Sequence, residues 1–366
     1  MWVDKLSIKT TIIGDGCAAL TLAAMSDKLP NHLIQLVKPD NAPVPIDHMW
    51  GFWGAKGLER QISLSRKKWN NWAIITESGQ SIMSSEEHPY YAIHRNEWLN
   101  YCRSEAKRLS VDIIDNSDFP KDSDLVFDSR PPRTIGKAML QHFYGIEVET
   151  KTPTFDSETA VLMDFRVDQS KGLHFIYLLP FSTTNALIES TIFSTDANVG
   201  EFYNQSINEY LDRIYSCTQF TIKHEEQGII PMGSLKPHDP NIPGIGGNAG
   251  AIRPGSGYAF VFIQKQIDAA IERSRNTGDL YFKTPHRKID LWMDGVLLTV
   301  LENYPEKGPK LFLQMAKSLS GDQFAKFMSG EISWSLRLKV IFAMPKLLFI
   351  KGVTRHIFRK RNKGVP

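Results

Sequence analysis

The chain has 366 residues, 42% of them apolar and 23% charged, and these values indicate a globular protein with one large domain or two intertwined domains. Its three cysteines, Cys17, Cys102 and Cys217, lie far apart and form no Cys-x-x-Cys pair. This spacing favours a reducing compartment and argues against a disulfide framework or a cysteine-ligated metal. The sequence shows no secretory signal pattern and no apolar run of the ~20 residues that span a membrane, so we expect a cytoplasmic protein.

The net charge of +3 is unevenly distributed along the chain. Nine basic residues and no acidic residue follow Glu331, so the first 331 residues carry a net negative charge. The basic character belongs to the C-terminal tail. An acidic body argues against nucleic acid as a partner.

The first predicted strand and helix carry a nucleotide-binding pattern. A β-branched run over residues 10–13 enters a glycine turn, and residues 18–25 have the composition of a helix. Gly14, Gly16 and Ala19 have the Gly-x-Gly-x-x-Ala spacing that places a dinucleotide pyrophosphate at a helix N-terminus. Gly14 makes the tight turn, Gly16 lets the backbone approach phosphates, and Ala19 lets the helix pack closely on the strand. We predict a dinucleotide site here, with an ordinary glycine turn as the alternative.

An aromatic-rich segment follows the second predicted strand, which covers residues 32–37. The segment spans residues 47–54 and contains Trp50 and Trp53. Two interpretations remain open: the segment is core or lid, or it is the wall of an apolar pocket close to the nucleotide.

Two further predicted strands end in charged residues. One ends at Arg95, before a helix that we expect Asn96 to cap. The other, over residues 125–130, delivers Asp128 just before two prolines. Because α/β folds present site residues at the carboxyl ends of their strands, Arg95 and Asp128 are candidates for a cofactor site.

Between residues 141 and 194 the pattern changes to long β segments separated by short turns, at 141–145, 160–166, 173–180 and 185–194. This pattern predicts an antiparallel sheet and a second, substrate-facing domain. The last segment places Glu189 among apolar and hydroxyl side chains. Burial there disfavours the charged form of a carboxyl group, which can then act as an acid near neutral pH. The alternative is a solvated residue at the edge of the sheet.

A second glycine-rich stretch, over residues 245–260, follows a helix predicted at 201–214 and a strand predicted at 225–233. It contains Gly247, Asn248 and Gly250 and opens a helix that continues through residue 270. Two glycine-rich loops before helix starts can bracket one extended cofactor. No metal is expected, because no His-Glu-x-x-His, Cys-x-x-Cys or aspartate-rich motif occurs.

With both loops placed, the chain resembles the flavin-dependent lycopene cyclases, which are related in fold to flavoproteins of the hydroxybenzoate hydroxylase type. The resemblance runs nearly end to end. The matching segments are 14–19, 50–53, 126–131, 141–145, 162–168, 179–182, 188–191, 228–232 and 247–258.

The resemblance implies an α/β (α+β) fold: a Rossmann-like FAD-binding domain intertwined with an antiparallel-sheet substrate domain, and a C-terminal helical region. We expect the FAD-binding domain at 1–140 and 225–275, the substrate domain at 141–224, and the helical region at 276–366.

The resemblance also implies an activity, the closure of the linear end of lycopene or a related carotene into a β-ionone ring without net oxidation or reduction. Reduced FAD is required, and NAD(P)H is the expected reductant. Glu189 matches the first acid of the family's glutamate motif and is assigned to proton transfer. Ser190 stands where many members carry a second acid, so Asp164, on another strand, is the candidate for a second carboxylate.

The cofactor and substrate residues follow from the same resemblance. The FAD contacts are assigned to Gly14, Gly16, Ala19, Arg95, Asp128, Gly247, Asn248 and Gly250. Asn248 stands where related flavin monooxygenases usually carry Asp. The substrate pocket is assigned to Trp50, Trp53, Phe165 and Phe181.

The tail has the pattern of a basic amphipathic helix over residues 345–359. Leu347, Ile350, Val353 and Ile357 recur at helical spacing, as do Lys351, Arg355 and Arg359. Such a helix can lie on an anionic membrane surface, where a carotenoid is dissolved. The alternative is a helix packed on the body with its basic face in water.

Two other functions remain open. One is a redox enzyme on the same frame, that is, a flavin monooxygenase, halogenase or prenyl reductase, which would consume reduced nicotinamide in step with product. The other is a flavin-fold protein that binds a carotenoid without reacting with it.

Overall fold

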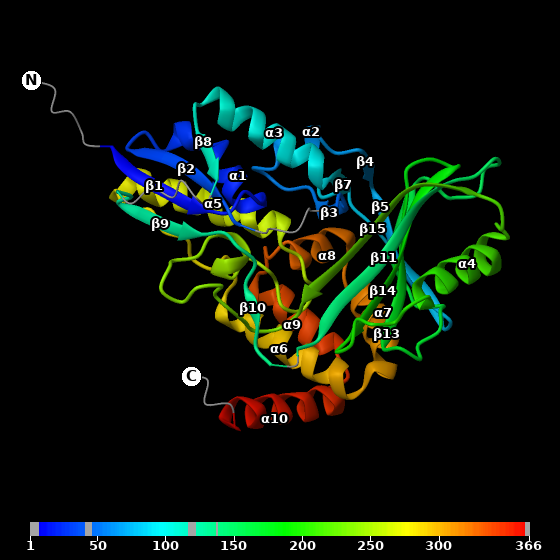
Figure 1. Cartoon of the computed structure of the whole chain (residues 1–366). Helices are drawn as coiled ribbons and strands as arrows, with labels where there is room; N and C mark the ends of the chain where they lie inside the picture. The colour runs from blue at the N-terminus through cyan, green and yellow to red at the C-terminus, as the bar shows by residue number, and fades with distance from the viewer. Residues whose placement is uncertain (1–6, 41–45, 116–121, 137, 363–366) are drawn as a thin grey trace, which may run out of the picture. The chain divides into compact units, whose positions relative to one another are not determined.

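The chain divides into two compact units, each built from three segments that are separated in the sequence. Unit 1 comprises residues 1–47, 94–136 and 234–290, and unit 2 comprises residues 48–93, 137–233 and 291–366. This computed structural model (Figure 1) describes residues 7–40, 46–115, 122–136 and 138–362, with side chains to residue 359. The chain therefore passes repeatedly from one unit to the other.

Unit 1 is built on a four-stranded sheet of order β8-β2-β1-β9, in which all neighbours are parallel. The strands are β1 (Ile8–Ile13), β2 (His32–Lys38), β8 (Asp112–Asp115) and β9 (Leu125–Asp128). The helices of this unit are α1 (Cys17–Ala23), α3 (Arg95–Arg108) and α5 (Phe260–Thr277), with α3 and α5 both packed on α1. Parallel strands connected through helices are the Rossmann-like arrangement that the glycine motif predicts.

Short elements complete unit 1. They are β10 (Arg133–Thr134), β16 (Leu235–Lys236), and the 3₁₀ helices η1 (Ser26–Lys28) and η3 (Gly246–Ala249). β10 and β16 pair with each other as an antiparallel ribbon.

Unit 2 is built on a seven-stranded sheet of order β15-β11-β14-β13-β12-β5-β6. The strands are β5 (Asn71–Thr76), β6 (Gly79–Ser84), β11 (Leu140–Glu149), β12 (Thr159–Asp164), β13 (Leu173–Pro180), β14 (Asn185–Ser194) and β15 (Thr221–Pro231). All neighbours are antiparallel except β12 and β5. The predicted antiparallel sheet is thereby confirmed, and with it the mixed fold class.

Unit 2 also contains a three-stranded sheet of order β3-β7-β4, a short helix and a group of C-terminal helices. These elements are β3 (Met49–Trp53), β4 (Lys67–Trp69), β7 (Tyr90–His94), α2 (Glu59–Ser63), α6 (Lys288–Asn303), η4 (Pro305–Lys307), α7 (Gly308–Ser318), α8 (Gly321–Met328), α9 (Trp334–Ala343) and α10 (Lys346–Asn362).

The two faces of the seven-stranded sheet are covered by different elements. Helix α4 (Phe202–Tyr215) lies along one face, where Ile146, Ile176 and Ile188 pack with its residue Tyr210 (Figure 1, green). The start of α7 covers the other face, where Gly308 lies against Leu173. Because successive residues of a strand point to opposite faces, Ile188 faces α4 and Glu189 points away from it.

The two units differ from the predicted domain boundaries. Residues 48–93, expected in the FAD-binding domain, belong to unit 2, because β5 pairs with β12 and β6 extends the sheet. Residues 225–233 also belong to unit 2, since β15 pairs with β11. The C-terminal helices join the same unit, where α7 packs on β5 and β6. These boundaries follow from long-range pairing that local sequence does not reveal.

Candidate active site

The turn after β1 has the geometry that its glycines predict. Gly14 has a φ of +118°, which favours glycine, and a Cβ there would lie 3.2 Å from the Ser129 side chain. Gly16 is the N-cap residue of α1 with no side-chain cap, and a Cβ at Gly16 would meet no atom within 4 Å. Ala19 is fully buried. Open space beside uncapped backbone N–H groups fits an anionic group such as a pyrophosphate.

The second glycine-rich stretch packs directly against the first. A Cβ on Gly246 would lie 2.4 Å from the Cβ of Ala18, so η3 touches the first turn of α1. Gly250 has a φ of +76° and ends η3. Gly247 lies against Ile252. The structure thus brings together the two glycine-rich segments, although they are more than 200 residues apart in the sequence.

Asp128 and Asn248 are engaged in bonds within unit 1. The buried carboxylate of Asp128 accepts hydrogen bonds from the Arg130 guanidinium, each at 2.9 Å. The Asn248 amide donates to the backbone oxygen of Asp128 at 2.9 Å and accepts from the His238 backbone N–H at 2.7 Å. Asn248 therefore ties the glycine-rich loop to the end of β9.

Arg95 lies close to the start of α1. Its guanidinium donates a hydrogen bond to the Asn96 side chain at 3.1 Å. Burial is the main cause that lowers the pKa of Arg95, and Cys17 and Asp15, near the glycine turn, oppose this shift. Helix α3 begins at Arg95, one residue before the expected Asn96 cap. The difference arises because Asp47 accepts the Asn96 backbone N–H at 2.9 Å and supplies the cap.

In unit 2, Glu189 belongs to a row of residues that crosses four strands. Glu226 of β15, Gly145 of β11, Glu189 of β14 and Tyr177 of β13 are direct neighbours in the register. A Cβ on Gly145 would lie 2.6 Å from the Cγ of Glu189 and 3.3 Å from the Cγ of Glu226. Since Gly145 has no side chain, the two glutamate side chains meet above it. We call Glu189 and Glu226 the carboxyl pair.

The surroundings of the carboxyl pair are apolar and nearly closed. The next row on the same face contains Phe175, Thr191 and Phe143. Glu189 is 7% exposed and Glu226 is 2% exposed. Few polar groups are therefore available to stabilise a negative charge on either carboxyl group.

Two polar groups contact or approach Glu226. The Met49 backbone N–H donates to its Oε2 at 3.1 Å, and Nε2 of His224 lies 3.9 Å from the same oxygen. The other oxygen of Glu226, Oε1, is buried, and no donor among the residues described forms a hydrogen bond with it. Next to Glu189, the Tyr177 hydroxyl is hydrogen-bonded to that of Tyr90 at 2.9 Å.

Both carboxyl groups hold protons more tightly than an exposed glutamate. Burial raises the pKa of Glu189 to about 7, and the hydrogen bond with Glu226, which lowers this pKa, is the smaller effect. Burial, and then the neighbouring Glu189, raise the pKa of Glu226 well above its usual range. A protonated carboxyl group is therefore present near neutral pH in apolar surroundings, as general acid catalysis requires.

The structure does not bring Asp164 to Glu189. Asp164 is fully buried on the face that α4 covers, where it pairs with Arg166 at 2.6 Å and accepts the Tyr210 hydroxyl at 2.8 Å. The carboxyl group beside Glu189 is instead that of Glu226, which the sequence reasoning missed. The sequence did contain a hint, because Glu226 lies two residues before Gly228 and so on the same face of the predicted strand. The strand that pairs with this one could not be predicted.

Two of the four predicted pocket residues are part of the core. Trp53 is 2% exposed and packs against the rings of Tyr90 and Trp72. Phe165 is 4% exposed and stacks on Phe312. These two side chains are therefore packed in the interior of unit 2.

The other two are partly exposed. The Arg66 guanidinium lies 3.7 Å from the ring centre of Phe181. Trp50 directly follows Met49, whose backbone N–H donates a hydrogen bond to Glu226. Of the four predicted pocket residues, it is therefore the closest in sequence to a residue that contacts the carboxyl pair.

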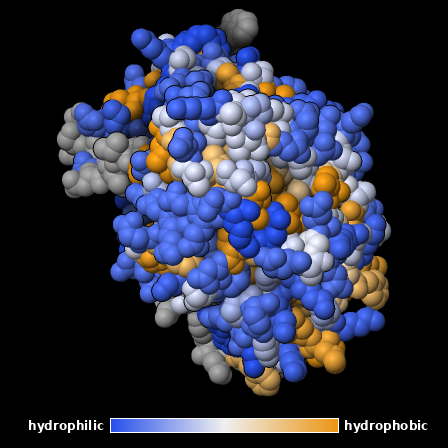
Figure 2. Space-filling model, turned by 90° about the vertical axis from the view of Figure 1, so that its right-hand side faces the viewer, coloured by the Kyte–Doolittle hydropathy of each residue, from blue (hydrophilic) through white to orange (hydrophobic). Residues whose placement is uncertain are grey.

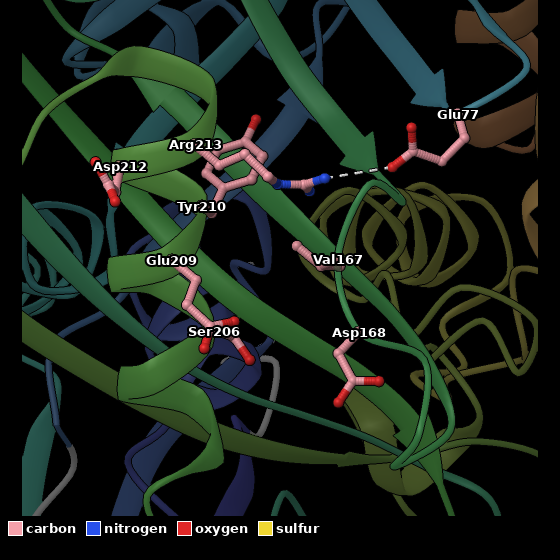
Figure 3. A pocket seen from close by; sticks show the side chains of 8 residues that line it. All are labelled: Glu77, Val167, Asp168, Ser206, Glu209, Tyr210, Asp212 and Arg213. Carbon is pink, nitrogen blue, oxygen red and sulfur yellow. Dashed lines mark hydrogen bonds and ion pairs between the residues drawn. The ribbon is translucent and has the colours of Figure 1, made fainter.

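A separate hollow of about 450 Å³ lies beside α4 (Figure 3). Its lining is mostly charged or polar and includes Asp168, Glu209 and Asp212, with Arg213 paired to Glu77 at 3.5 Å. Figure 3 shows that Glu209, Asp212 and Arg213 come from α4, Asp168 from the segment after β12, and Glu77 from the turn between β5 and β6. Sites for apolar ligands are lined mainly by apolar side chains, so this hollow does not suit a hydrocarbon substrate.

Two kinds of feature are absent from the described residues. No helix in this part of the chain is long and apolar enough to cross a membrane. Nor do three or more His, Cys, Asp or Glu side chains within it form a group that could hold a metal ion.

Comparison with protein families gives one match that covers most of the chain. The model of the family described as lycopene cyclase protein matches residues 10–352.

Individual relatives align over shorter regions. A lycopene beta-cyclase from a Paracoccus strain is 30% identical over 152 residues, which cover 40% of this chain and 38% of that protein. A lycopene beta-cyclase from Pantoea ananas is 25% identical over 218 residues, which cover 56% of each. The matched part of the chain thus spans at most about half the length of these relatives.

Among solved structures, a flavin-dependent brominase is similar in fold. Its TM-score is 0.61 at 13% identity, and the match covers 90% of this chain and 96% of that one. At this identity the similarity concerns the fold alone.

Proposed function

Because this chain belongs to the lycopene cyclase family, we propose that it is a carotenoid cyclase that converts the linear end of lycopene or a related carotene into a β-ionone ring. The family match confirms the resemblance found in the sequence. The observation that carries the proposed activity is the Glu189 carboxyl group, which is buried among apolar side chains and has its pKa raised to about 7. Near neutral pH such a group is protonated in a substantial fraction of the molecules, and its protonated form can protonate an alkene.

The proposed reaction moves one proton in and one proton out. Glu189 gives its proton to the terminal double bond, and the resulting cation is attacked by the next suitably placed double bond, which closes the ring with a new carbon–carbon bond. The ring cation then loses a proton to the Glu189 carboxylate, so no electrons are gained or lost. The rings of Phe143 and Phe175, in the row next to Glu189, support the exclusion of water, which would otherwise capture the cation.

We assign FAD to unit 1. The backbone at Gly14 and Gly16 and the start of α1 would hold its pyrophosphate, with Gly246 packed against Ala18 and Arg95 close by. Flavin-dependent enzymes with this fold support the assignment. When bound in its reduced, anionic form, with NAD(P)H as reductant, the flavin supplies negative charge that stabilises a carbocation.

We also propose contact with a membrane surface, through α9 and α10. Eight of the fourteen exposed large apolar side chains among the described residues lie on these helices: Trp334, Leu338, Ile341, Phe342, Leu347, Ile350, Ile357 and Phe358. Figure 2 shows hydrophobic side chains at the lower end of the molecule, at the height of α10 in Figure 1. Exposed apolar patches of this kind are typical of interaction sites.

The basic residues of α10 are arranged differently from the prediction. Arg355 donates to Asn303 at 2.6 Å and Arg359 pairs with Glu302, so both face α6. Gly352 lies against Val300 and lets the two helices pack closely. The apolar side chains of α10, not these arginines, are therefore the proposed membrane contacts.

Vesicle flotation tests the membrane proposal. With vesicles of phosphatidylcholine and phosphatidylglycerol, the wild type should float, whereas Leu347→Ser combined with Ile350→Ser should largely remain in solution. Leu33→Ser removes an equally apolar side chain that is 58% exposed in unit 1, and it should float like the wild type. Equal flotation of all three proteins would refute the proposal.

A redox enzyme is the second candidate, favoured by the fold shared with the flavin-dependent brominase. Such an enzyme consumes about one reduced nicotinamide for each product, whereas a cyclase consumes almost none. Nicotinamide oxidation measured against carotene converted separates the two.

Pigment analysis of lycopene-accumulating bacteria tests the cyclase itself. The wild type should give a β-ring product, and Glu189→Gln should leave lycopene unchanged. Unchanged lycopene with well-expressed, flavin-loaded wild type would refute cyclisation of this substrate, and conversion by the variant would refute the role of Glu189.

A further inference from the structure

Building on the proposed cyclase function, we propose that Glu226 is a positioning residue that stays protonated and donates a hydrogen bond to the Glu189 carboxylate. Glu189 is then the group that exchanges a proton with the substrate, and Glu226 acts through it. The proposal rests on the carboxyl pair above Gly145.

The strand register makes the pair possible. Glu226 and Glu189 lie on strands that are both hydrogen-bonded to β11, on either side of Gly145. Any side chain at that position would stand between them, because its Cβ would already be 2.6 Å from the Cγ of Glu189. The missing side chain therefore places the two carboxyl groups in direct contact.

Hydrogen bonding indicates which form Glu226 takes. Its Oε2 accepts from the Met49 backbone, and its buried Oε1 has no other donor in the described part of the chain. Two ionised carboxylates would contain no donor at all and would repel each other in an apolar site. A proton on Glu226 gives the pair its donor and removes the repulsion.

Few other charged or titratable groups face the carboxyl pair. Tyr177 and Tyr90 form a hydroxyl pair with each other. The row that contains Phe143, Thr191 and Phe175 lies on one side of the pair. In the row on the other side, Glu147 is already paired with Arg66 at 2.7 Å. His224 alone among these groups would favour an ionised Glu226, but its Nε2 is 3.9 Å away, beyond hydrogen-bond distance.

The direction of the pKa shifts agrees with this assignment. Burial and then Glu189 raise the pKa of Glu226 well above its usual range, so Glu226 is the member that keeps its proton. Its hydrogen bond lowers the pKa of Glu189, which burial raises to about 7. Glu189 thus exchanges its proton near neutral pH, and its carboxylate has a hydrogen-bond donor when the proton leaves.

The proton balance is simple. When Glu189 protonates the substrate, its O–H bond breaks and a C–H bond forms. The carboxylate left on Glu189 accepts the O–H of Glu226, whose own bond does not break. The proton lost from the ring returns to Glu189, so the pair ends in the state in which it began.

Two substitutions of Glu226 separate a neutral donor from a carboxylate. Glu226→Gln keeps the shape, an acceptor for Met49 and an N–H donor for Glu189, so its rate and the alkaline limb of its pH–rate profile should stay close to wild type. Glu226→Leu removes the donor, so the rate should fall on the order of 10- to 100-fold. Its alkaline limb should move to higher pH, because burial of Glu189 is then unopposed.

The neighbouring Glu225 provides a matched control. Its carboxylate accepts the Tyr144 hydroxyl at 2.8 Å on the other face of the sheet. Glu225→Gln should therefore change neither the rate nor the limb. Equal impairment of Glu226→Gln and Glu226→Leu would overturn the proposal, as would an alkaline limb that stays in place in Glu226→Leu.

Infrared spectroscopy of the flavin-loaded protein without substrate tests the same point independently of activity. At about pH 8, where ordinary carboxyl groups are ionised, the wild type should show the carbonyl band of a protonated carboxyl group. The band should vanish in Glu226→Gln and persist in Glu225→Gln. Absence of the band in the wild type overturns the proposal even if the protein cyclises carotenes, whereas its presence in a protein without cyclase activity supports the hydrogen-bonded pair and refutes only the proposed function.

Discussion

The two faces of the seven-stranded sheet in unit 2 each bury a carboxyl group, and the two groups have opposite environments. On the face covered by α4, Asp164 is bound to Arg166 and Tyr210. On the other face, Glu189 meets Glu226 and apolar side chains. A cation stabilises the ionised form, while burial beside a second acid favours the protonated form. The neighbouring groups, and not burial alone, therefore decide which protonation form of a buried acid is favoured.

The largest expected effect is on catalysis by the carboxyl pair. Glu189→Gln replaces a protonated carboxyl group by an amide of the same shape, so the cyclisation rate should fall by about 10²- to 10⁴-fold or more, as for the loss of a general acid. Rate assays with carotene in vesicles, together with urea unfolding, check this. A large loss of stability in place of the loss of rate would place Glu189 with Asp164 as a structural residue.

Asp164→Asn should have the opposite profile. It leaves Arg166 without its partner, and removal of one member of a buried pair is strongly destabilising. Because the Arg166 side chain is 27% exposed and partly solvated, we expect a loss of about 2 kcal/mol in the free energy of unfolding, with the rate per folded molecule retained. Asp168→Asn is the control, since the Asp168 carboxylate is exposed and accepts from Ser170, and it should unfold much like the wild type.

Gly145→Ala should weaken the contact within the carboxyl pair. The new methyl group has to push the Cγ of Glu189 from a distance of 2.6 Å, and overpacking of this kind costs about 1–3 kcal/mol. The rate should fall along with stability. Gly228→Ala is matched to it, because its Cβ would meet the Phe143 ring at 2.7 Å on the same face. If both variants lose equal stability and equal rate, the effect of Gly145 is packing alone.

The smallest expected effects concern the dependence of stability on pH, which should have opposite signs on the two faces. Glu189 has its pKa raised from 4.5 to about 7, so its contribution is present below about pH 4.5 and is lost as the pH rises to about 7. On the α4 face, burial lowers the pKa of His174 from 6.5 to about 4, so its contribution is present above about pH 6.5 and is lost as the pH falls to about 4.

Single variants separate these two slopes, which partly cancel in the wild type. Between about pH 4.5 and 6.5, Glu189→Gln should make stability rise more steeply with pH, and His174→Gln should make it rise less steeply, each by on the order of 1–3 kcal/mol. Urea unfolding at several pH values measures both. Parallel curves for the two variants and the wild type would show that neither group titrates differently on folding.

Local patterns were enough for the elements whose physics is local. The glycine turn at residues 14–16 predicted its own geometry, because positive φ at Gly14 and close packing at Ala19 are properties of a few consecutive residues. The antiparallel sheet was predicted from features that are also local, namely long β segments separated by short turns. Glu189 was singled out because its strand surrounds it with apolar residues.

Other features depended on which strands pair. Alternation in β14 assigns Ile188 and Glu189 to opposite faces, but it does not say which face α4 covers. From the sequence alone, Asp164 was therefore as reasonable a candidate for the second carboxylate beside Glu189 as any other acid. Residues 48–93, expected in the FAD-binding domain, lie in unit 2 for the same reason, since β5 pairs with β12, more than 80 residues later.

Residue patterns were sufficient to identify the family, the mixed α/β fold, the glycine turn and the candidate acid, because these depend on local periodicity, on glycine conformation and on an ordered series of motifs. The contact between Glu226 and Glu189, with Gly145 between them, became known from the folded chain alone. A carboxyl group's charge state depends on the groups that touch it, and in a sheet those groups come from strands that are far apart in the chain.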